Sequence, residues 1–311
     1  MVISGASRVD QVDIKQLIRD VAFDVLKSAP TRLLHTQTGT LCDRDTQISH
    51  FLVSRQCNEL LSSVMACCPN QRVESIRAVV LAYFRYVMLS HRWGEDEPSL
   101  RDVEGSSIYS MSTKAGHEKL QAFCLIACKK DYLWAWSDTC CIDKDSSAEL
   151  QEAIGSMFRW YRRSTLTIVY LADVSDAGSF SSSKWFGRGW TLQELLAPRT
   201  VLFYTQNWSL YKNLTSSNHK TDSLVIGELE STTRIVSPFL IDFSPGMDDA
   251  RSRLQWASSR RTTRPEDIAY SLFGIFNLHL PVLYGESAEN ALGRLLAEII
   301  SQSGEISVLD W

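Results

Sequence analysis

The segment from Trp190 to Leu196 could place one carboxylate, that of Glu194, at the ligand-binding edge of a sheet. A carboxylate in that position can hydrogen-bond hydroxyl groups and stabilise positive charge that develops during a reaction. The spacing also fits a structural role, because Thr191-x-x-Glu194 is a capping box, in which the glutamate satisfies a backbone N–H at the start of a helix. Spacing alone favours the cap, so the chemical interpretation depends on the residues elsewhere in the chain.

A second polar segment lies about a hundred residues upstream, where Ser90, His91, Arg92, Trp93 and Gly94 end an apolar run that predicts a buried strand. Such a loop lies at the carboxyl end of its strand, which is where ligands bind in open α/β sheets. The five residues offer a hydroxyl, an imidazole, a cation, a stacking ring and an unhindered backbone, a set suited to a dinucleotide. The alternative is a structural turn with Trp93 in the core and His91 at the surface, without a carboxylate partner.

Three more candidates follow the aromatic strand that is predicted at 132–136. Asp138 and Asp143 flank Cys140 and Cys141. If this strand neighbours the first one, its polar end lies near the same loop. A binding role for Asp138 competes with an Asx turn, and a buried small thiol is favoured over a nucleophile for Cys141, because no histidine and acid pair is recognisable for it.

Strand and helix patterns alternate through the middle of the chain. Helices are predicted at 13–27, 53–65 and 117–129 and after the capping box Ser146-x-x-Glu149, and strands from Tyr86 and at 132–136, 165–171 and 201–204. This alternation indicates an α/β fold with a mainly parallel sheet flanked by helices. We expect a helical N-terminal extension over 1–80, an α/β core over 81–210 and a helical C-terminal part over 211–311, whose last helix starts near Ser287.

Composition narrows the function classes. The 311 residues are 44% hydrophobic and carry a net charge of -4, so the chain lacks the positive field that a phosphate backbone requires, and we expect no nucleic-acid partner. The amino end has no apolar core of signal-peptide length, and Arg85 breaks the apolar run 78–89, so we expect a cytoplasmic protein without a membrane segment. The eight cysteines lack zinc-site spacing, which favours free thiols and predicts no metal site.

Several blocks of the sequence resemble the fungal heterokaryon incompatibility (HET) domain. The three signature blocks of that family are similar to Tyr86–Gly94, Trp136–Asp143 and Arg188–Pro198, in this order and at this separation. The segments Arg261–Tyr270 and Pro281–Glu286 are similar to a block that follows the HET core in many of these proteins. The resemblance covers roughly residues 30–311, and its motifs are specific.

HET domains resemble, more distantly, the Toll/interleukin receptor (TIR) domain. Met88–Asp96 looks like the first strand and loop of a plant TIR domain, with Trp93 inserted. Both Ser183–Trp185 and Trp190–Leu195 are similar to the TIR segment whose glutamate is catalytic in NAD-cleaving members, with Thr191 in place of a cysteine. The resemblance implies a TIR- or flavodoxin-like parallel sheet and a catalytic Glu194. The substrate-binding residues that we predict with it are Ser90, His91, Arg92, Trp93, Gly94, Asp138, Cys141, Asp143 and Trp190.

The resemblance also implies a function. It suggests an effector of nonself recognition and programmed cell death, a form of fungal innate immunity, that hydrolyses NAD to nicotinamide and an ADP-ribose product. NAD is then the substrate, and no cofactor or metal is required, because the positively charged nicotinamide is a good leaving group through an oxocarbenium-like transition state. Self-association and an upstream recognition protein are expected as partners. The alternative is a non-enzymatic signalling and oligomerisation module, whose signature blocks hold the fold while its exposed faces recruit partners.

Overall fold

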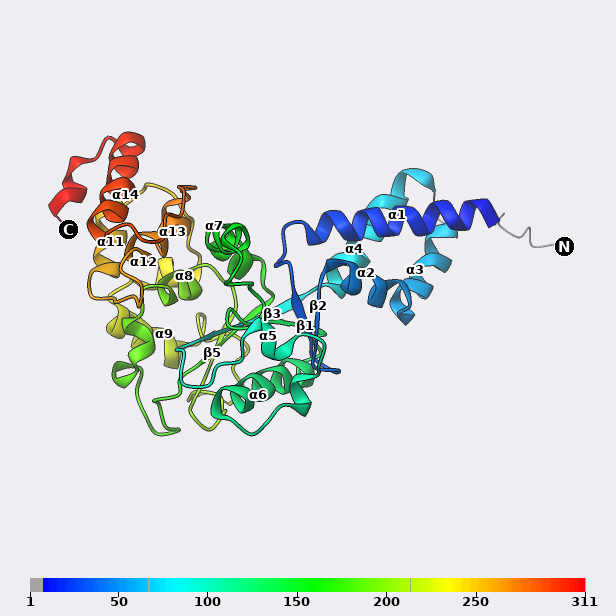
Figure 1. The fold of residues 1–311 in the computed structure, drawn as a ribbon, viewed down its shortest axis with the longest axis horizontal. Helices are drawn as coiled ribbons and strands as arrows, with labels where there is room; N and C mark the ends of the chain where they lie inside the picture. The colour runs from blue at the N-terminus through cyan, green and yellow to red at the C-terminus, as the bar shows by residue number, and fades with distance from the viewer. Residues whose placement is uncertain (1–7, 67, 213, 311) are drawn as a thin grey trace. The chain divides into compact units, whose positions relative to one another are not determined.

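The computed structural model describes residues 8–66, 68–212 and 214–310, and Figure 1 shows the order of their helices and strands. The elements fall into two compact units. The first lies within residues 1–86 and 98–141, and the second comprises 87–97 and 142–311. The division that the sequence predicts at residues 80 and 210 stays a prediction.

Helices dominate the first part of the first unit. They are α1 (Arg8–Leu26), α2 (Arg44–Leu52), α3 (Arg55–Ala66) and α4 (Pro69–Tyr83), and α1 packs along α4 (Figure 1). Ile18, Ala22 and Leu26 of α1 are fully buried and four residues apart, so one face of this helix forms core. The helices predicted at 13–27 and 53–65 are thus confirmed as α1 and α3.

The same part of the chain also contains strands, which the sequence analysis does not predict. A hairpin joins β1 (Leu33–His35) to β2 (Thr40–Cys42), and its turn holds Gly39 at φ 72°. A Cβ at Gly39 would lie 2.6 Å from the hydroxyl oxygen of Ser107, so the turn requires glycine for space as well as for its left-handed backbone. The expected helical N-terminal extension over 1–80 therefore also contains two short strands, at 33–35 and 40–42.

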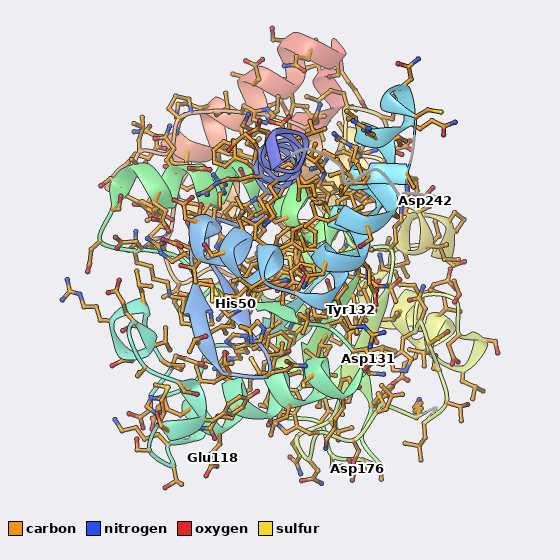
Figure 2. All side chains as sticks on the ribbon, turned by 90° about the vertical axis from the view of Figure 1, so that its right-hand side faces the viewer. His50, Glu118, Asp131, Tyr132, Asp176 and Asp242 are labelled. Atoms are coloured by element: carbon orange, nitrogen blue, oxygen red, sulfur yellow. The ribbon has the colours of Figure 1, made fainter. Side chains whose placement is uncertain are left out.

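The strands of the first unit run antiparallel about β1. Leu34 of β1 pairs with β2 on one side and, on the other, with β4 (Trp134–Trp136), which confirms the aromatic strand that the sequence predicts at 132–136. The stacked rings of His35 and His50 lie 5.0 Å apart, both edge-on to Trp134 (His50 is labelled in Figure 2). Burial, and to a smaller degree the charge of His50, lower the pKa of His35, which favours the neutral form of the His35 ring. Helices α5 (Leu100–Val103) and α6 (Ala115–Lys129) complete the unit, and α6 confirms the helix predicted at 117–129.

The second unit contains the parallel strands. They are β3 (Tyr86–His91), β5 (Leu166–Tyr170) and β6 (Val201–Tyr204), in the spatial order β3-β5-β6, and they confirm three predicted strands. Nearly every residue of these strands is buried, as in a sheet that is covered on both faces. The α/β class is confirmed, but the six strands are mixed in direction, because β1 pairs antiparallel with β2 and β4. The expected mainly parallel sheet is therefore parallel only among β3, β5 and β6, and its TIR- or flavodoxin-like character stays a prediction.

Helix α7 (Ser147–Arg163) supports the strand that contains the polar segment. The hydroxyl oxygen of Ser146 accepts a hydrogen bond from the N–H of Glu149, which confirms the predicted cap. The Tyr161 hydroxyl, on the buried face of α7, donates to the carbonyl oxygen of Leu89 at 3.0 Å. This bond attaches the helix to β3 one residue before Ser90.

Residues beyond 210 form helices, as the sequence predicts. They are α9 (Ser223–Thr233), α10 (Ser237–Ile241), α11 (Ala250–Ser258), α12 (Asp267–Tyr270), α13 (Phe273–Phe276) and α14 (Ala288–Ser303). Ser287 caps α14 by accepting from the N–H of Asn290 at 3.2 Å, so the last helix starts where the sequence predicts. Of the helices in the described ranges, none has both the length and the apolar composition to span a membrane.

Candidate functional site

Ser90 and Glu194 meet inside the second unit. Ser90, the penultimate residue of β3, donates a hydrogen bond from Oγ to Oε2 of Glu194. The indole Nε1 of Trp185 donates to the same Ser90 Oγ at 2.9 Å. Ser90 and Trp185 are each 1% exposed and Glu194 is 7% exposed, so this row of hydrogen bonds lies almost wholly out of water. Because the row ends on a carboxylate, its last bond is of the stronger, charge-assisted kind when Glu194 is ionised.

The short helix α8 (Thr191–Leu196) holds Glu194, and its start is not the predicted capping box. Trp190 occupies the N-cap position with helical backbone angles and no side-chain cap bond. The Thr191 hydroxyl donates to the carbonyl oxygens of Trp185, at 2.8 Å, and Arg188, at 2.9 Å, instead of accepting a helix N–H. The capping interpretation of Thr191-x-x-Glu194 is therefore wrong, and the carboxylate of Glu194 faces the hydroxyl of a strand.

A buried cation, Arg260, is attached to the start of α8. Its Nη1 donates to the carbonyl oxygen of Arg188 and to the Thr191 hydroxyl oxygen, both at 3.0 Å. Burial lowers the pKa of Arg260 to about 10, and the negative charge of Glu194 opposes that shift. The guanidinium therefore stays charged at neutral pH. Arg260 is not among the predicted site residues, because it directly precedes the block Arg261–Tyr270 and carries no motif or periodic signal of its own.

The loop after β3 is organised by Glu97. The Gly94 N–H donates to Glu97 Oε1 at 2.7 Å, and Glu97 Oε2 lies 3.6 Å from His91 Nε2. His91 is only 5% exposed. The expectation of a surface histidine without a carboxylate partner is therefore wrong. The carboxylate lies six residues downstream and reaches His91 only because the loop folds back.

Trp93 and Arg92 face outward from this loop. The Trp93 side chain is 41% exposed, so the alternative that placed it in the core is wrong. The Lys144 ammonium lies 3.9 Å from the centre of the Trp93 ring, at cation–π distance, and Arg92 is exposed. The segments after β3 and around Lys144 thus present an aromatic face and two cations together.

Asp143 has a structural partner at the start of α7. Its Oδ1 accepts from the N–H of Asp145 at 3.0 Å, and its own N–H donates to Glu149 Oε1 at 2.9 Å. These contacts form an Asx-type turn that leads into the helix. The geometry gives Asp143 a clear role in the turn, and its substrate-binding role stays a prediction.

Trp190 contacts the C-terminal block. Its indole Nε1 donates to Asp267 Oδ2 at 2.9 Å, and the Tyr284 hydroxyl donates to Asp267 Oδ1 at 3.0 Å. Burial raises the pKa of Asp267, and these two hydrogen bonds oppose the rise. Trp190, the residue before α8, is thus connected through Asp267 to both C-terminal segments, 261–270 and 281–286.

Asp138 and Cys141 belong to the first unit, whereas Ser90 and Glu194 belong to the second, and the substrate-binding roles of Asp138 and Cys141 stay predictions. Cys141 is 2% exposed, as expected for a buried thiol. Its backbone N–H donates to the carbonyl oxygen of Ser137 at 3.0 Å. A hydrogen bond to Cys141, together with burial, raises the pKa of the neighbouring Cys140 thiol well above its usual value. Asp138 is half-buried in the turn after β4.

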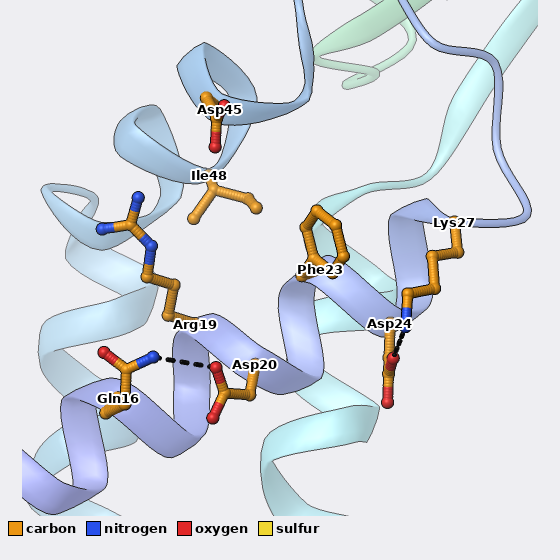
Figure 3. Close-up of a pocket in the computed structure, with 8 residues that line it drawn as sticks. All are labelled: Gln16, Arg19, Asp20, Phe23, Asp24, Lys27, Asp45 and Ile48. Carbon is orange, nitrogen blue, oxygen red and sulfur yellow. Dashed lines mark hydrogen bonds and ion pairs between the residues drawn. The ribbon is translucent and has the colours of Figure 1, made fainter.

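Other features of the described chain do not add to the site. A pocket of about 440 Å³ in the first unit is shown in Figure 3. Three of its charged side chains already have partners, since Gln16 donates to Asp20 at 2.8 Å and Lys27 pairs with Asp24 at 2.7 Å. It contains no predicted site residue. Within the described ranges, no group of three or more His, Cys, Asp or Glu side chains could hold a metal ion.

Comparisons with known proteins agree with the family resemblance that the three signature blocks predict. Residues 86–181 match the family model described as heterokaryon incompatibility protein (HET), a range that includes Ser90 but ends before Glu194. The chain is 43% identical over 233 residues to the vegetative incompatibility protein HET-E-1 of Podospora anserina, and the match covers 70% of this chain and 16% of that protein. The chain therefore spans only a small part of its relative's length. No solved structure matches the chain. The family match and the relative confirm the predicted resemblance, and the chain belongs to the heterokaryon incompatibility (HET) family.

Proposed function

We propose that this chain hydrolyses NAD to nicotinamide and an ADP-ribose product, with Glu194 as the catalytic carboxylate. The observation that carries the proposal is the buried row of hydrogen bonds from Trp185 through Ser90 to Glu194, at the carboxyl end of a parallel strand. Ligands of open α/β sheets bind at such strand ends. A carboxylate held there in a dry environment acts more strongly on a developing positive charge than it would in water.

The reaction needs little more than this group. The bond between the ribose carbon and the nicotinamide nitrogen breaks, and its electron pair neutralises the positive pyridinium ring. Glu194 stabilises the oxocarbenium-like sugar and hydrogen-bonds a ribose hydroxyl. A water oxygen then bonds to the same carbon and releases a proton to solvent. Ser90, as the donor to Glu194, would hold the carboxylate in place during these steps.

The exposed part of the loop supports recognition of the rest of the dinucleotide. Trp93 offers a ring for stacking, while Arg92 and Lys144 offer positive charge to a diphosphate. The proposed binding contacts are therefore Trp93, Arg92 and Lys144, with Glu194 as the catalytic group and Ser90 as the residue that holds its carboxylate. No metal or further cofactor enters this scheme.

In the cell, we infer a role in nonself recognition and programmed cell death, since the matched relative is named for vegetative incompatibility. Depletion of NAD would stop energy metabolism and kill the fused cell. Because the relative is much longer than the matched part, further segments or a separate upstream protein would recognise the trigger. Self-association of the chain would then bring the sites into their active form in the cytoplasm.

Nicotinamide release tests the proposal. The purified chain, at micromolar and at several-hundred-micromolar concentration, is incubated with NAD, and the products are separated by chromatography. Glu194→Gln should lower the rate by about 10²–10³-fold, because the replacement keeps the shape and removes the charge. Glu298→Gln, on α14, removes the same charge elsewhere and should leave the rate unchanged. Unfolding midpoints of all three proteins show whether the fold is retained.

The burial of the site favours one other candidate, a non-enzymatic signalling and oligomerisation module. Glu194 is only 7% exposed, which also suits a carboxylate that holds α8 to β3. Under this alternative, NAD stays intact at every protein concentration, and Glu194→Gln lowers the unfolding midpoint. Intact NAD at the higher concentration would reject the enzymatic proposal, whereas nicotinamide release that depends on Glu194 would reject the module as the whole function.

A further inference from the structure

Two side chains fix the first turn of α8, Thr191 of the helix itself and Arg260 of the segment after α11. The Thr191 hydroxyl reaches back to the carbonyl oxygens of Trp185 and Arg188, and Arg260 donates to that hydroxyl oxygen and to the Arg188 carbonyl. The Arg260 Nε donates to the carbonyl oxygen of Trp256 at 3.1 Å, so the guanidinium is anchored at its other edge. Arg260 is 4% exposed.

The backbone beside Arg260 reinforces this attachment. Arg261 forms a parallel bridge with Arg188, in which the Gly189 N–H donates to the Arg261 carbonyl oxygen at 2.8 Å and the Arg261 N–H donates to the Gly187 carbonyl oxygen at 2.7 Å. A Cβ on Gly189 would lie 2.5 Å from a methyl carbon of Thr262. The two segments are thus pressed together, and the guanidinium cannot move away from α8 without breaking these bonds.

The Arg260 guanidinium contacts Thr191, three residues before Glu194 on α8, so a buried positive charge lies about one helical turn from the carboxylate. Removing either charge leaves the other buried and uncompensated, which is unfavourable in a low-dielectric environment. Other charged groups contact α8 or its flanking residues: Asp267 at Trp190, Arg162 at the Ala197 carbonyl, and Lys220 at the Leu196 and Pro198 carbonyls. On β3, the His91 imidazole faces Glu97. Arg260 differs from these groups because it joins the turn that leads into Glu194 and is attracted by the charge of Glu194 itself.

We propose that Arg260 is a positioning residue for Glu194, which holds the first turn of α8 through Arg188 and Thr191 and keeps the carboxylate ionised with its own buried charge. The inference rests on the proposed catalytic role of Glu194. It assigns Arg260 no contact with the substrate. Its effect is to deliver a charged, oriented carboxylate, because a protonated Glu194 could not stabilise an oxocarbenium-like sugar.

The direct test follows the ionisation of Glu194 by carbon-13 NMR of labelled glutamate carboxyl groups, with the signal assigned from its absence in Glu194→Gln. Arg260→Met removes the charge and the hydrogen bonds, and Arg260→Gln removes the charge but keeps donors, so it folds more readily. In both variants the Glu194 carboxyl should titrate at least one pH unit higher than in the unsubstituted chain, a tenfold rise in proton affinity. Arg260→Lys keeps the charge and should restore most of the original titration.

A matched control is available in Arg253, which is 3% exposed, lies on α11 and donates to the carbonyl oxygen of Ile275 at 3.0 Å. Arg253→Met also removes a buried arginine, so it should lower stability without moving the titration of Glu194. An equal shift in Arg253→Met and Arg260→Met would overturn the inference, since general destabilisation would then explain both. An unchanged titration in folded Arg260→Gln would overturn it as well.

The enzymatic readout separates this inference from the proposed function. In Arg260→Gln, the pH below which kcat for nicotinamide release falls should rise by the same one unit or more as the Glu194 titration, while KM for NAD stays within about twofold. A merely structural loss would lower activity equally at every pH. If the unsubstituted chain leaves NAD intact, the proposed function fails, and the NMR titration still decides whether Arg260 controls the charge of Glu194.

Discussion

Replacing Lys220 by Met should change how the stability of the second unit depends on pH. Lys220 is fully buried, and its ammonium donates to the carbonyl oxygens of Leu196, at 3.3 Å, and Pro198, at 2.5 Å, at the C-terminal end of α8. Burial lowers the pKa of Lys220 from 10.5 to about 7. The charge of the nearby Arg162 is a smaller cause of this lowered pKa, and that of Asp242, labelled in Figure 2, opposes it.

The pH dependence of the free energy of unfolding follows from the two pKa values of Lys220, 10.5 in the unfolded chain and about 7 in the folded one, which differ by roughly 3.5 units. At about 1.4 kcal/mol per unit, holding this buried charge costs on the order of 5 kcal/mol. The cost is fully present below pH 7, where both states bind the proton. Between pH 7 and 10.5 only the unfolded state keeps the proton, so the free energy of unfolding rises with pH by about 1.4 kcal/mol per unit.

Urea unfolding at pH 6, 7.5 and 9 measures this dependence. The free energy of unfolding of the unsubstituted chain, minus that of Lys220→Met, should rise by about 2 kcal/mol from pH 7.5 to 9. The variant also leaves two carbonyl groups without a donor, at about 1–3 kcal/mol each, but that loss does not vary with pH. Lys184→Met, at an exposed position, should give a flat difference. A flat difference for Lys220→Met over the same range would refute the reasoning.

Two further substitutions test the site and its packing. Ser90→Ala removes the hydrogen bond that β3 donates to the carboxylate of Glu194. Nicotinamide release should therefore fall about 10- to 100-fold, and the free energy of unfolding should fall by about 1–3 kcal/mol. Full activity would show that Ser90 does not orient the carboxylate. Gly274→Ala places a Cβ 2.2 Å from the Cβ of Phe158 on α7, so the unfolding free energy should fall by about 1–3 kcal/mol or more, by urea titration. Gly227→Ala, on α9, adds a Cβ that would meet no atom within 4 Å, so it should instead raise the free energy of unfolding by about 0.5–1 kcal/mol. Similar losses in Gly274→Ala and Gly227→Ala would contradict the packing argument.

The parallel strands were predictable because their residues are buried on both faces. Continuous apolar runs mark β3, β5 and β6, and each is bounded by polar or turn residues that end the run. The antiparallel pair β1 and β2 was not predictable in this way. Three residues are too few to show a period of two, and the pair is stabilised by partners far along the chain, such as Ala135.

Local spacing was a poor guide to the hydrogen bonds of the site. Thr191 has the spacing of an N-cap, yet its hydroxyl donates to carbonyl oxygens, because the turn that contains Trp185 and Arg188 places these acceptors within 3 Å. His91 has no acid near it in the expected strand, yet Glu97 returns to it through the loop. In both cases a partner outside the local pattern decided the role of the side chain.

The position of Glu194 depends on contacts that a short helix cannot provide for itself. Six residues form too few helical hydrogen bonds to be stable alone, so α8 takes its orientation from the groups that surround it. Those groups are Ser90 from β3, Arg260 from the segment after α11 and Lys220 from the segment after β6. Ser90 lies within the matched HET range 86–181, whereas the two cations lie beyond it. A fragment that ends at residue 210 would keep Ser90 and Glu194 but lose both cations, and its carboxylate would lack the buried charge and the bonds that hold it.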